Sequence, residues 1–384
     1  MTPLMKVLLE CFFSRRPTDS TSLIEQLLRM RLLGSRQDMD VGPSWRAPSA
    51  DWSRRALRCV LIALWALSAP GSAAAQRPAF GPLSWEEGGP LQRISHTPMS
   101  EGADVTARGA LSVDLWLGFS NIFEQDSTET HVLFMDMERL LTAVTLRWGV
   151  ADDLEIGGRL TFETTGGGFL DSFVLWYHES LGFGQANRDR FPQDVYGQRL
   201  ADGAETLFVD VGPRTLGLDD ARLFAKWRAA SSRDGRSLLS LRGAARIPAQ
   251  SNRAGRRSTD LTLTGIGRLG IGAWYLHAML GASTARASAE LEPIMRAGSA
   301  FMAIALERSL GGRVAGILQY QISSPLLRGF GHRELDRAPS NVLLGLAGRW
   351  GERWSWDAGF QEDVPSDTPA IDFTLSVRVS RTWR

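Results

Sequence analysis

The sequence IDFTLSVRVSRTW, from Ile371 to Trp383, lies one residue from the end of the chain and decides the fold. Apolar and polar residues alternate along it, so one face of an extended strand is apolar and the other polar. Bacterial outer-membrane barrels alternate apolar-out and polar-in in this way, and pairing of the last strand with the first leaves no exposed edge. The stretch therefore predicts the closing strand of a transmembrane β-barrel, with an aromatic residue next to the C-terminus.

A second pattern lies far upstream, at 54–75. Arginines precede the apolar run Cys59–Leu67, and small residues lead from it to Ala75. A basic flank, a short apolar core and a small-residue exit are typical of a signal peptide, whereas a membrane-spanning helix needs about 20 apolar residues. We therefore expect export through a signal peptide, with a buried core helix as the alternative.

These two patterns divide the chain into parts. Both cysteines, Cys11 and Cys59, precede the expected cleavage site, so the mature chain offers neither a disulfide nor a thiolate metal site. The net charge of +1 gives no basic excess for nucleic acid. The expected parts are 1–53, a mis-annotated or disordered extension with translation beginning near Met39 (a genuine cytoplasmic extension is the alternative); 54–75, the signal peptide; 76–109, a periplasmic N-terminal segment; and 110–384, the outer-membrane β-barrel.

Alternation recurs along most of the barrel region. A single alternating segment also occurs in soluble sandwiches, but here many segments agree with their connections, in which short turns alternate with longer loops. The fold we predict is all-β: a closed antiparallel transmembrane barrel of about 12 strands, with one long helix-containing outer loop at 164–217. The predicted strands are 110–120, 131–149, one between 152 and 164, 218–229, 237–247, 259–269, 271–282, 299–308, 312–322, 340–349, 353–363 and 371–383.

Tryptophans give a partly independent indication of the same fold. Six of them fall near the short-turn ends of their predicted strands: Trp148, Trp227, Trp274, Trp350, Trp354 and Trp383. Indole rings favour the membrane interface, where an apolar body and a polar N–H are both accommodated. A soluble sandwich has no reason to gather tryptophans at one end.

Polar residues occupy the alternate positions, which would face the lumen, and cations outnumber carboxylates among them. The candidate ligand-binding residues of the lumen are Arg159, Arg222, Arg242 and Arg246. One interpretation is a water-filled path with a mild preference for anions. The other is a narrow barrel filled by paired arginines and carboxylates, and the strand number does not decide between them.

The long insertion opens on three glycines and continues as a helix-like run with an apolar arc. The candidate ligand-binding residues of this loop are Phe169, Phe173, Trp176 and Tyr177. An apolar helix face needs a partner. The helix could cap the mouth, fold into the lumen or lie on the outer leaflet. Its aromatic residues either pack against neighbouring loops or capture an apolar solute.

Several stretches resemble one bacterial family. Gly166–Pro192 contains the sequences GGFLDSF, YHESLGFG and NRDRFP, and it is the most specific part. Together with four shorter stretches it resembles the domain-of-unknown-function family 3187 of outer-membrane β-barrel proteins, over most of 80–384. The resemblance implies a secreted protein of the Gram-negative outer membrane, and it carries over no catalytic or binding residues. The shorter stretches are Ser120–Phe123, Asp136–Glu138, Leu218–Arg222 and Gly359–Asp363.

The histidines show no metal-site spacing, so we expect no metal and no cofactor. A lipid-processing enzyme would need a nucleophile, a base and an orienting group in mutual reach. Ser283, His277 and a lumenal carboxylate could supply these, but nothing in their spacing requires it. We therefore expect no catalytic residues.

The expected function is an outer-membrane channel or uptake protein for a small solute of unknown identity. The alternative is a structural or surface-interaction barrel with a closed, salt-bridged lumen, and a lipid-processing enzyme is the weakest reading. Expected partners are outer-membrane lipid and lipopolysaccharide, the barrel-assembly machinery and a small solute, with no nucleic acid. Candidates for binding lipopolysaccharide phosphates are the loop arginines Arg188, Arg190, Arg253, Arg256 and Arg257.

Overall fold

The computed structural model describes the larger part of the region after the expected signal peptide, and all described residues belong to one compact unit, Ala50–Arg384. The N-terminal extension, the signal peptide and the arginines at 253, 256 and 257 lie outside them. The described residues are 79–94, 97–127, 131–181, 188–202, 205–209, 212–249, 259–285, 292–325, 327–328, 336–363, 371 and 373–384.

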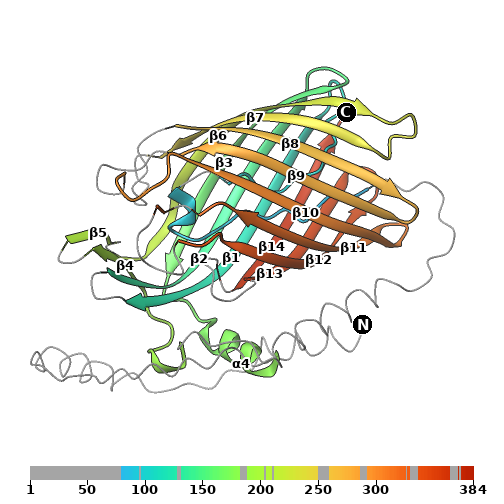
Figure 1. The fold of residues 1–384 in the computed structure, drawn as a ribbon. Helices are drawn as coiled ribbons and strands as arrows, with labels where there is room; N and C mark the ends of the chain where they lie inside the picture. Colours follow the sequence, from blue (N-terminus) through green and yellow to red (C-terminus); the bar gives the residue numbers. More distant parts are fainter. Residues whose placement is uncertain are drawn as a thin grey trace, which may run out of the picture. The chain divides into compact units, whose positions relative to one another are not determined.

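Twelve strands in the described ranges form a closed antiparallel barrel (Figure 1). β1 pairs with β2 on one side and with β14 on the other, from Leu111 opposite Trp383 to Asn121 opposite Phe373. The predicted closure of the first strand on the last is thus confirmed. The barrel strands are β1 (Leu111–Ser127), β2 (His131–Gly149), β3 (Leu154–Gly166), β6 (Arg214–Ser231), β7 (Leu238–Pro248), β8 (Asp260–Ile271), β9 (Trp274–Thr284), β10 (Gly298–Gly311), β11 (Val314–Ser323), β12 (Ser340–Trp350), β13 (Trp354–Asp363) and β14 (Phe373–Trp383).

The two ends of the barrel differ in their connections. At the short-turn end, β2–β3, β6–β7, β8–β9, β10–β11 and β12–β13 are joined by two to six residues, and at the long-loop end most connections are longer. The predicted loop at 121–130 is wrong, because β1 continues to Ser127 and β2 already begins at His131. The paired residues Asn121–Ser127 of β1 and Val132–Glu138 of β2 protrude as a flap (Figure 1). A hairpin from the insertion, which the sequence did not predict, widens this flap; its strands are β4 (Gly197–Asp202) and β5 (Glu205–Val209).

Side chains alternate across the barrel wall as the sequence predicts. On β14, Leu375 and Val377 are exposed, while Thr374, Ser376 and Ser380 are buried. Exposed leucines, valines and isoleucines cover the outer surface of nearly all strands, and the predicted tryptophans lie near the short-turn end. Phe373 is the exception, because it points outward but is only 3% exposed.

Helix α4 (Asp171–Leu181) explains this exception, and it confirms the helical run predicted in the insertion. Val174 of the helix and Leu170 just before it form an apolar cluster with Phe373, flanked by Phe119 and Phe360. The helix therefore packs on the outer face of β1, β14 and β13 at the long-loop end. No helix in the described ranges has the length and apolar composition needed to cross a membrane.

Candidate functional site

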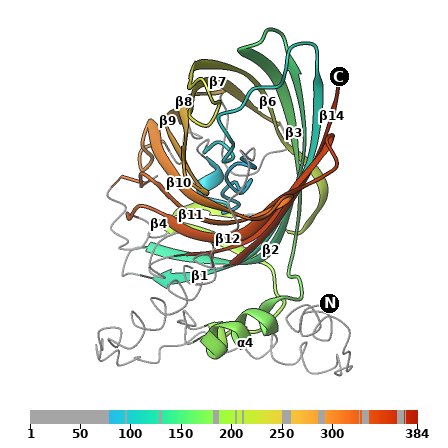
Figure 2. The same ribbon diagram turned by 90° about the vertical axis from the view of Figure 1, so that its right-hand side faces the viewer.

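The lumen is occupied by the chain's own N-terminal segment, described residues 79–94 and 97–109, called the plug below. Figure 2 shows it in blue inside the ring of strands. It rises from the short-turn end to the long-loop end and returns to the start of β1. Contacts in chain order show this path: Phe80 N with Glu307 Oε1 (3.0 Å), the Gly88 carbonyl with Arg139 (2.7 Å), Ser100 Oγ with Gln321, and Thr106 N with Glu155 (2.6 Å).

This path differs from the expected one. We predicted a periplasmic segment at 76–109, but its described part lies inside the barrel. The sequence 79–109 has no alternation, so it cannot add a strand to the wall. Its buried apolar residues Leu83, Trp85 and Ile94 instead meet the inner surface.

The tip of the plug closes the long-loop end through a set of buried apolar side chains, called the mouth cluster below. Leu91 and Ile94, at the short helix η1 (Gln92–Ile94), pack against the inner face of the flap. Three of the partners are methionines, whose flexible side chains fill irregular space. The full cluster is Leu91, Ile94, Ile122, Leu133, Met135, Met137, Leu200, Met295, Leu327 and Ile371.

Below the tip, one plug carboxylate is surrounded by guanidinium groups. Glu86 is 3% exposed and pairs with Arg159 of β3 at 2.8 Å, with Arg222 of β6, and with the plug's own Arg93 at 2.9 Å. Burial raises the pKa of Glu86, but the charges of the three arginines outweigh this and hold it well below its usual range. The carboxyl is therefore ionised inside the lumen.

A second plug carboxylate lies closer to the short-turn end. Glu101 pairs with Lys226 of β6 and with Arg242 of β7, each at 3.2 Å. Lys226 also pairs with Glu155 of the wall at 3.0 Å. Burial raises the pKa of Glu101, but the charges of Lys226 and Arg242 lower it to about 2. Both acidic residues thus attach the plug to the same side of the barrel, β3–β6–β7.

A positively charged residue of the plug also pairs with carboxylates of the wall. Arg93 pairs with Asp219 and, at 3.1 Å, with Asp220, while Arg246 donates to the Arg93 carbonyl at 3.0 Å. On β1, where the Trp116 ring lies beside Arg159, Trp116 Nε1 donates to the Ser84 carbonyl at 2.8 Å. Below its apolar tip the plug is therefore held by ion pairs and hydrogen bonds together with apolar contacts of Leu83 and Trp85.

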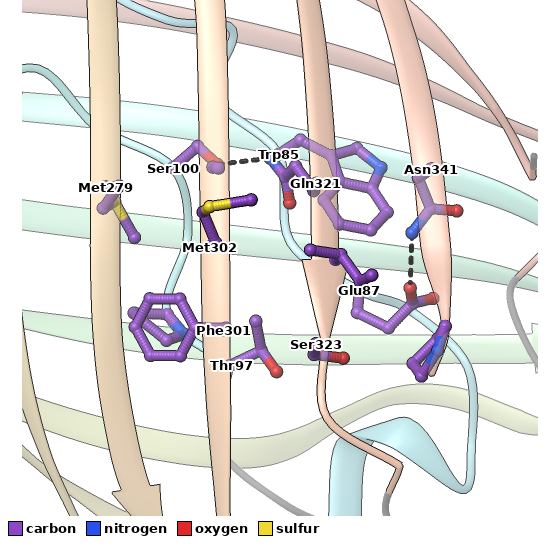
Figure 3. A pocket seen from close by; sticks show the side chains of 14 residues that line it. Trp85, Glu87, Thr97, Ser100, Met279, Phe301, Met302, Gln321, Ser323 and Asn341 are labelled. Atoms are coloured by element: carbon purple, nitrogen blue, oxygen red, sulfur yellow. Dashed lines mark hydrogen bonds between the residues drawn. The ribbon is translucent and has the colours of Figure 1, made fainter. Parts of the chain in front are cut away.

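A small pocket remains between the plug and β9–β12, with an empty volume of about 330 Å³ that includes its opening. Trp85 and Glu87 of the plug line it together with Met279, Phe301 and Asn341 of the wall (Figure 3). Asn341 donates to Glu87 at 3.1 Å, and the Trp85 indole N–H has no hydrogen-bond partner among the described residues. Burial raises the pKa of Glu87 to about 7.

The structure brings the four predicted lumenal arginines together on one side, but not on an open path. Arg159 and Arg222 contact Glu86, Arg242 contacts Glu101, and Arg246 contacts the Arg93 carbonyl and Asp220. Each of the four is at most 8% exposed. Binding of a solute by these arginines stays a prediction.

The four predicted aromatic residues of the insertion lie elsewhere, on the outer face. Phe173 and Tyr177 contact Phe373, with ring centroids 5.6 and 5.8 Å apart, whereas Phe169 and Trp176 are more than half exposed. They neither enter the lumen nor contact the four arginines in the described structure. The placement of this helix inside the lumen is wrong, whereas its position on the outer leaflet and the binding of an apolar solute there stay predictions.

The family-like motif of the insertion forms a buried polar cluster under α4. Asn121 donates to Asp171 at 2.8 Å, and Arg188 pairs with Asp171 at 3.2 Å. Glu138 accepts from the Phe169 N at 2.6 Å and from the Leu170 N, where the helix begins. A carboxylate at a helix N-terminus stabilises the unpaired N–H groups there. Arg188 is 3% exposed and therefore does not fit its expected role in binding lipopolysaccharide, whereas Arg190 is exposed.

The candidate catalytic triad is not assembled. His277 contacts Glu307 at 2.9 Å, but the Ser283 hydroxyl bonds Thr262 and lies six residues further along β9, about 20 Å away at ~3.3 Å per residue. No group of three His, Cys, Asp or Glu residues in the described part of the chain is placed to hold a metal ion.

Sequence reasoning missed Glu86, Glu87, Arg93 and Glu101, because it assigned them to a segment outside the barrel. Their signal was present in composition: between Leu83 and Ile94, bulky apolar residues stand close to carboxylates. Such a mixture in a segment without periodicity is consistent with burial against a polar surface.

A family model described as "Protein of unknown function (DUF3187)" matches residues 58–383. No curated protein matches the chain. Among solved structures, the COG4313 outer membrane channel from Pseudomonas putida F1 is similar at 12% identity and a TM-score of 0.48, covering 73% of this chain and 98% of that one. The KdgM porin is similar at 8% identity and a TM-score of 0.35, covering 71% and 99%. The translocator domain of the autotransporter NalP from Neisseria meningitidis is similar at 12% identity and a TM-score of 0.37, covering 73% and 90%.

Proposed function

We propose that this chain, which belongs to the DUF3187 family, is an outer-membrane uptake channel for a small solute, closed in the observed state by its own N-terminal plug. The proposal rests on the observation that the ring of strands is complete without the plug. All twelve strands pair with one another, from β1 through β14 and back to β1, and the plug contributes no strand to the wall. The plug can therefore leave while the ring of strands stays intact.

Placement in a membrane follows from the outer surface. Residues such as Leu223, Leu263 and Leu280 are more than 60% exposed and lie on the outside of neighbouring strands. A continuous apolar surface of this size is unfavourable in water but matches the apolar band of a membrane barrel. The tryptophans near the short-turn end would lie at one interface.

Orientation follows from the connections. In outer-membrane barrels the short turns face the periplasm and the longer loops face outward. The plug would then enter from the periplasmic side, with α4 and the mouth cluster on the outer side. Lipopolysaccharide, with Arg190 as a candidate contact, and the barrel-assembly machinery remain proposed partners, and export would use the signal peptide at 54–75.

The ion pairs of the plug suit reversible withdrawal. The partners of a buried pair become hydrated on withdrawal, so the net contribution of the pair is smaller than that of an equally large apolar core. Glu86, Glu101 and Arg93 make such pairs on one side of the lumen. Withdrawal must also separate the mouth cluster and the apolar contacts of Leu83 and Trp85 with β10–β12.

Planar-bilayer recording of the purified full chain and of a variant lacking 79–104 tests the proposal. We expect the full chain to be mostly closed with brief openings, and the deletion variant to conduct steadily. A matched control lacks 169–181, which removes α4 from the outer face and should leave the lumen closed. Resistance to detergent unfolding before heating shows that each variant still forms a barrel.

The second candidate is a structural or surface-interaction barrel. The network of Arg93, Arg159 and Arg222 around Glu86 favours it, because such a network also serves to fill a lumen permanently. A folded deletion variant without conductance would support this candidate and contradict the channel.

A further inference from the structure

We propose that Glu86 and Glu101 of the plug occupy the positions of an anionic, carboxylate-bearing solute, and that this solute opens the channel by competing with them. The inference rests on the proposed function and names its substrate class. Some cations of the wall have their carboxylate partners on the plug, and others have them on the wall itself.

Three wall arginines depend on the plug for a carboxylate partner. Within the described structure, Arg159 pairs with no carboxylate besides Glu86, and its other contacts are Met99, the Thr161 hydroxyl and the Trp116 ring. Arg242 likewise pairs there only with Glu101, and it lies over the Phe224 ring at 4.3 Å. Arg268 of β8, near the short-turn end, pairs there only with the exposed Asp104 of the plug at 2.5 Å. Withdrawal of the plug leaves all three guanidinium groups without an ion-pair partner, although Asp220 of the wall still acts on Arg159 from further away.

Other lumenal cations keep partners on the wall. Arg147 pairs with Asp114, and Arg378 pairs with Asp357 at 2.6 Å. Arg222 and Arg246 both retain Asp220, each at 2.8 Å. The plug's own Arg93 leaves together with Glu86. The uncovered positive charge therefore lies at Arg159 and Arg242, and at Arg268 near the short-turn end.

An unpaired guanidinium in a confined lumen is unfavourable, and a carboxylate is the partner that its planar donor groups fit best. An anion from solution would therefore stabilise the withdrawn state and shift the equilibrium toward it. A neutral or cationic solute gives no such stabilisation.

The geometry provides two successive anion positions along the wall. Arg159 lies opposite Arg222, and Arg242 lies opposite Lys226, four residues further along β6. Four residues of a strand span ~13 Å. The path suits either a solute with several carboxylates or a small one that moves from one position to the next, as conduction through several weak sites requires.

The experiment follows plug withdrawal in the full chain in proteoliposomes. The expected mature chain has no cysteine, so Ser100→Cys places a single thiol on the buried plug, and its rate of maleimide labelling reports exposure. We expect choline succinate to accelerate labelling at least fivefold over choline chloride at matched ionic strength, and added glucose to have no effect. Adding Arg159→Gln and Arg242→Gln should remove the response, and adding Arg214→Gln instead, which changes the pair of two wall residues, Arg214 and Glu163 at 2.8 Å, should preserve it.

A second measurement keeps the inference testable if those variants fold poorly. The barrel lacking 79–104 should prefer chloride over potassium in reversal potentials, and Arg159→Gln with Arg242→Gln in that background should reduce the preference. Equal acceleration of labelling by choline chloride, or a conducting barrel without anion preference, overturns the inference and leaves the proposed channel function intact. Absence of any conductance overturns the channel itself.

Discussion

Asp357 on β13 accepts two hydrogen bonds from Ser84 of the plug, one from its backbone N at 2.9 Å and one from its hydroxyl at 3.1 Å. The same carboxylate accepts from Arg378 Nε at 2.6 Å. This contact lies on the β13–β14 side, whereas Glu86 and Glu101 are held on the β3–β6–β7 side. The plug is thus attached to two different parts of the wall.

Replacement of Asp357 by alanine should loosen the plug. It leaves the Ser84 N–H unpaired and deprives Arg378 of its nearest carboxylate, and each lost charged hydrogen bond costs about 1.5–3 kcal/mol. We expect open probability in planar bilayers to rise at least tenfold. Asp153→Asn at a short turn, where the carboxylate accepts only from Trp227 Nε1 in the described structure, is the control and should leave gating unchanged. A closed Asp357→Ala channel would contradict the attachment.

The indole of Trp116 gives a finer test of the same docking. Trp116→Phe keeps an aromatic ring near Arg159 but removes the N–H that the Ser84 carbonyl accepts. Loss of one neutral hydrogen bond costs about 1 kcal/mol, or roughly fivefold in the closing equilibrium. Single-channel open times should lengthen accordingly, and an unchanged equilibrium would show that the plug does not depend on this bond.

Plug docking should depend on pH through Glu87. Burial raises the pKa of Glu87 from its ordinary value of 4.5 to about 7, although hydrogen bonds from Gly89 and Asn341 favour the charged form. The docked state therefore binds the proton more tightly. The stabilisation of the docked plug by this proton is fully present below pH 4.5 and is lost as the pH rises through 7.

The lowered pKa values of Glu86 and Glu101 act in the opposite sense, but only in more acidic solution, where these carboxyls begin to gain protons. As the pH rises from 5 to 8, we therefore expect the open probability to increase, by up to about tenfold per pH unit below pH 7. Glu87→Gln should give a flat profile near the acidic, closed level. The same slope in the variant and the unmodified chain would exclude Glu87 as the cause.

Docking of α4 on the outer face can be tested without disturbing the lumen. Val174 is fully buried in the cluster with Phe373, and burial of a valine contributes about 1.5–3 kcal/mol. Val174→Asp should release the insertion, so that added protease cleaves it many times faster in proteoliposomes. Trp176→Asp, at an exposed position of the same helix, is the matched control. Equal cleavage of both variants would argue against docking through this face.

The wall of the barrel was predictable because each strand carries its own signal. Alternation in Leu111–Phe119 and in Phe373–Val379 fixes which side chains point outward, and the pairing of these strands then follows from closure. The continuation of β1 to Ser127 was not predictable from alternation, because Asn121 and Gln125 interrupt the apolar positions. Asn121 is buried by contact with Asp171 and Arg188, far away in sequence.

The occupant of the lumen could not be predicted from a local pattern. The described residues 79–94 and 97–109 form no regular element except η1, and their partners are spread over β1, β3, β6, β7, β10, β11, β12 and β13. The arginines of the wall were correctly expected to face inward. Their partners were not, because Glu86 and Glu101 meet them only through the tertiary path of the plug.

The return of the plug to the end from which it rises has a consequence for assembly. Within the described residues the plug forms a doubled finger joined to β1 at its base, so neither end of this segment has to be threaded through the ring. The finger can therefore be inserted after β1 and β14 have zipped together, and it can come out again without breaking that seam. Formation of the barrel and its later closure by the plug can thus occur at different times.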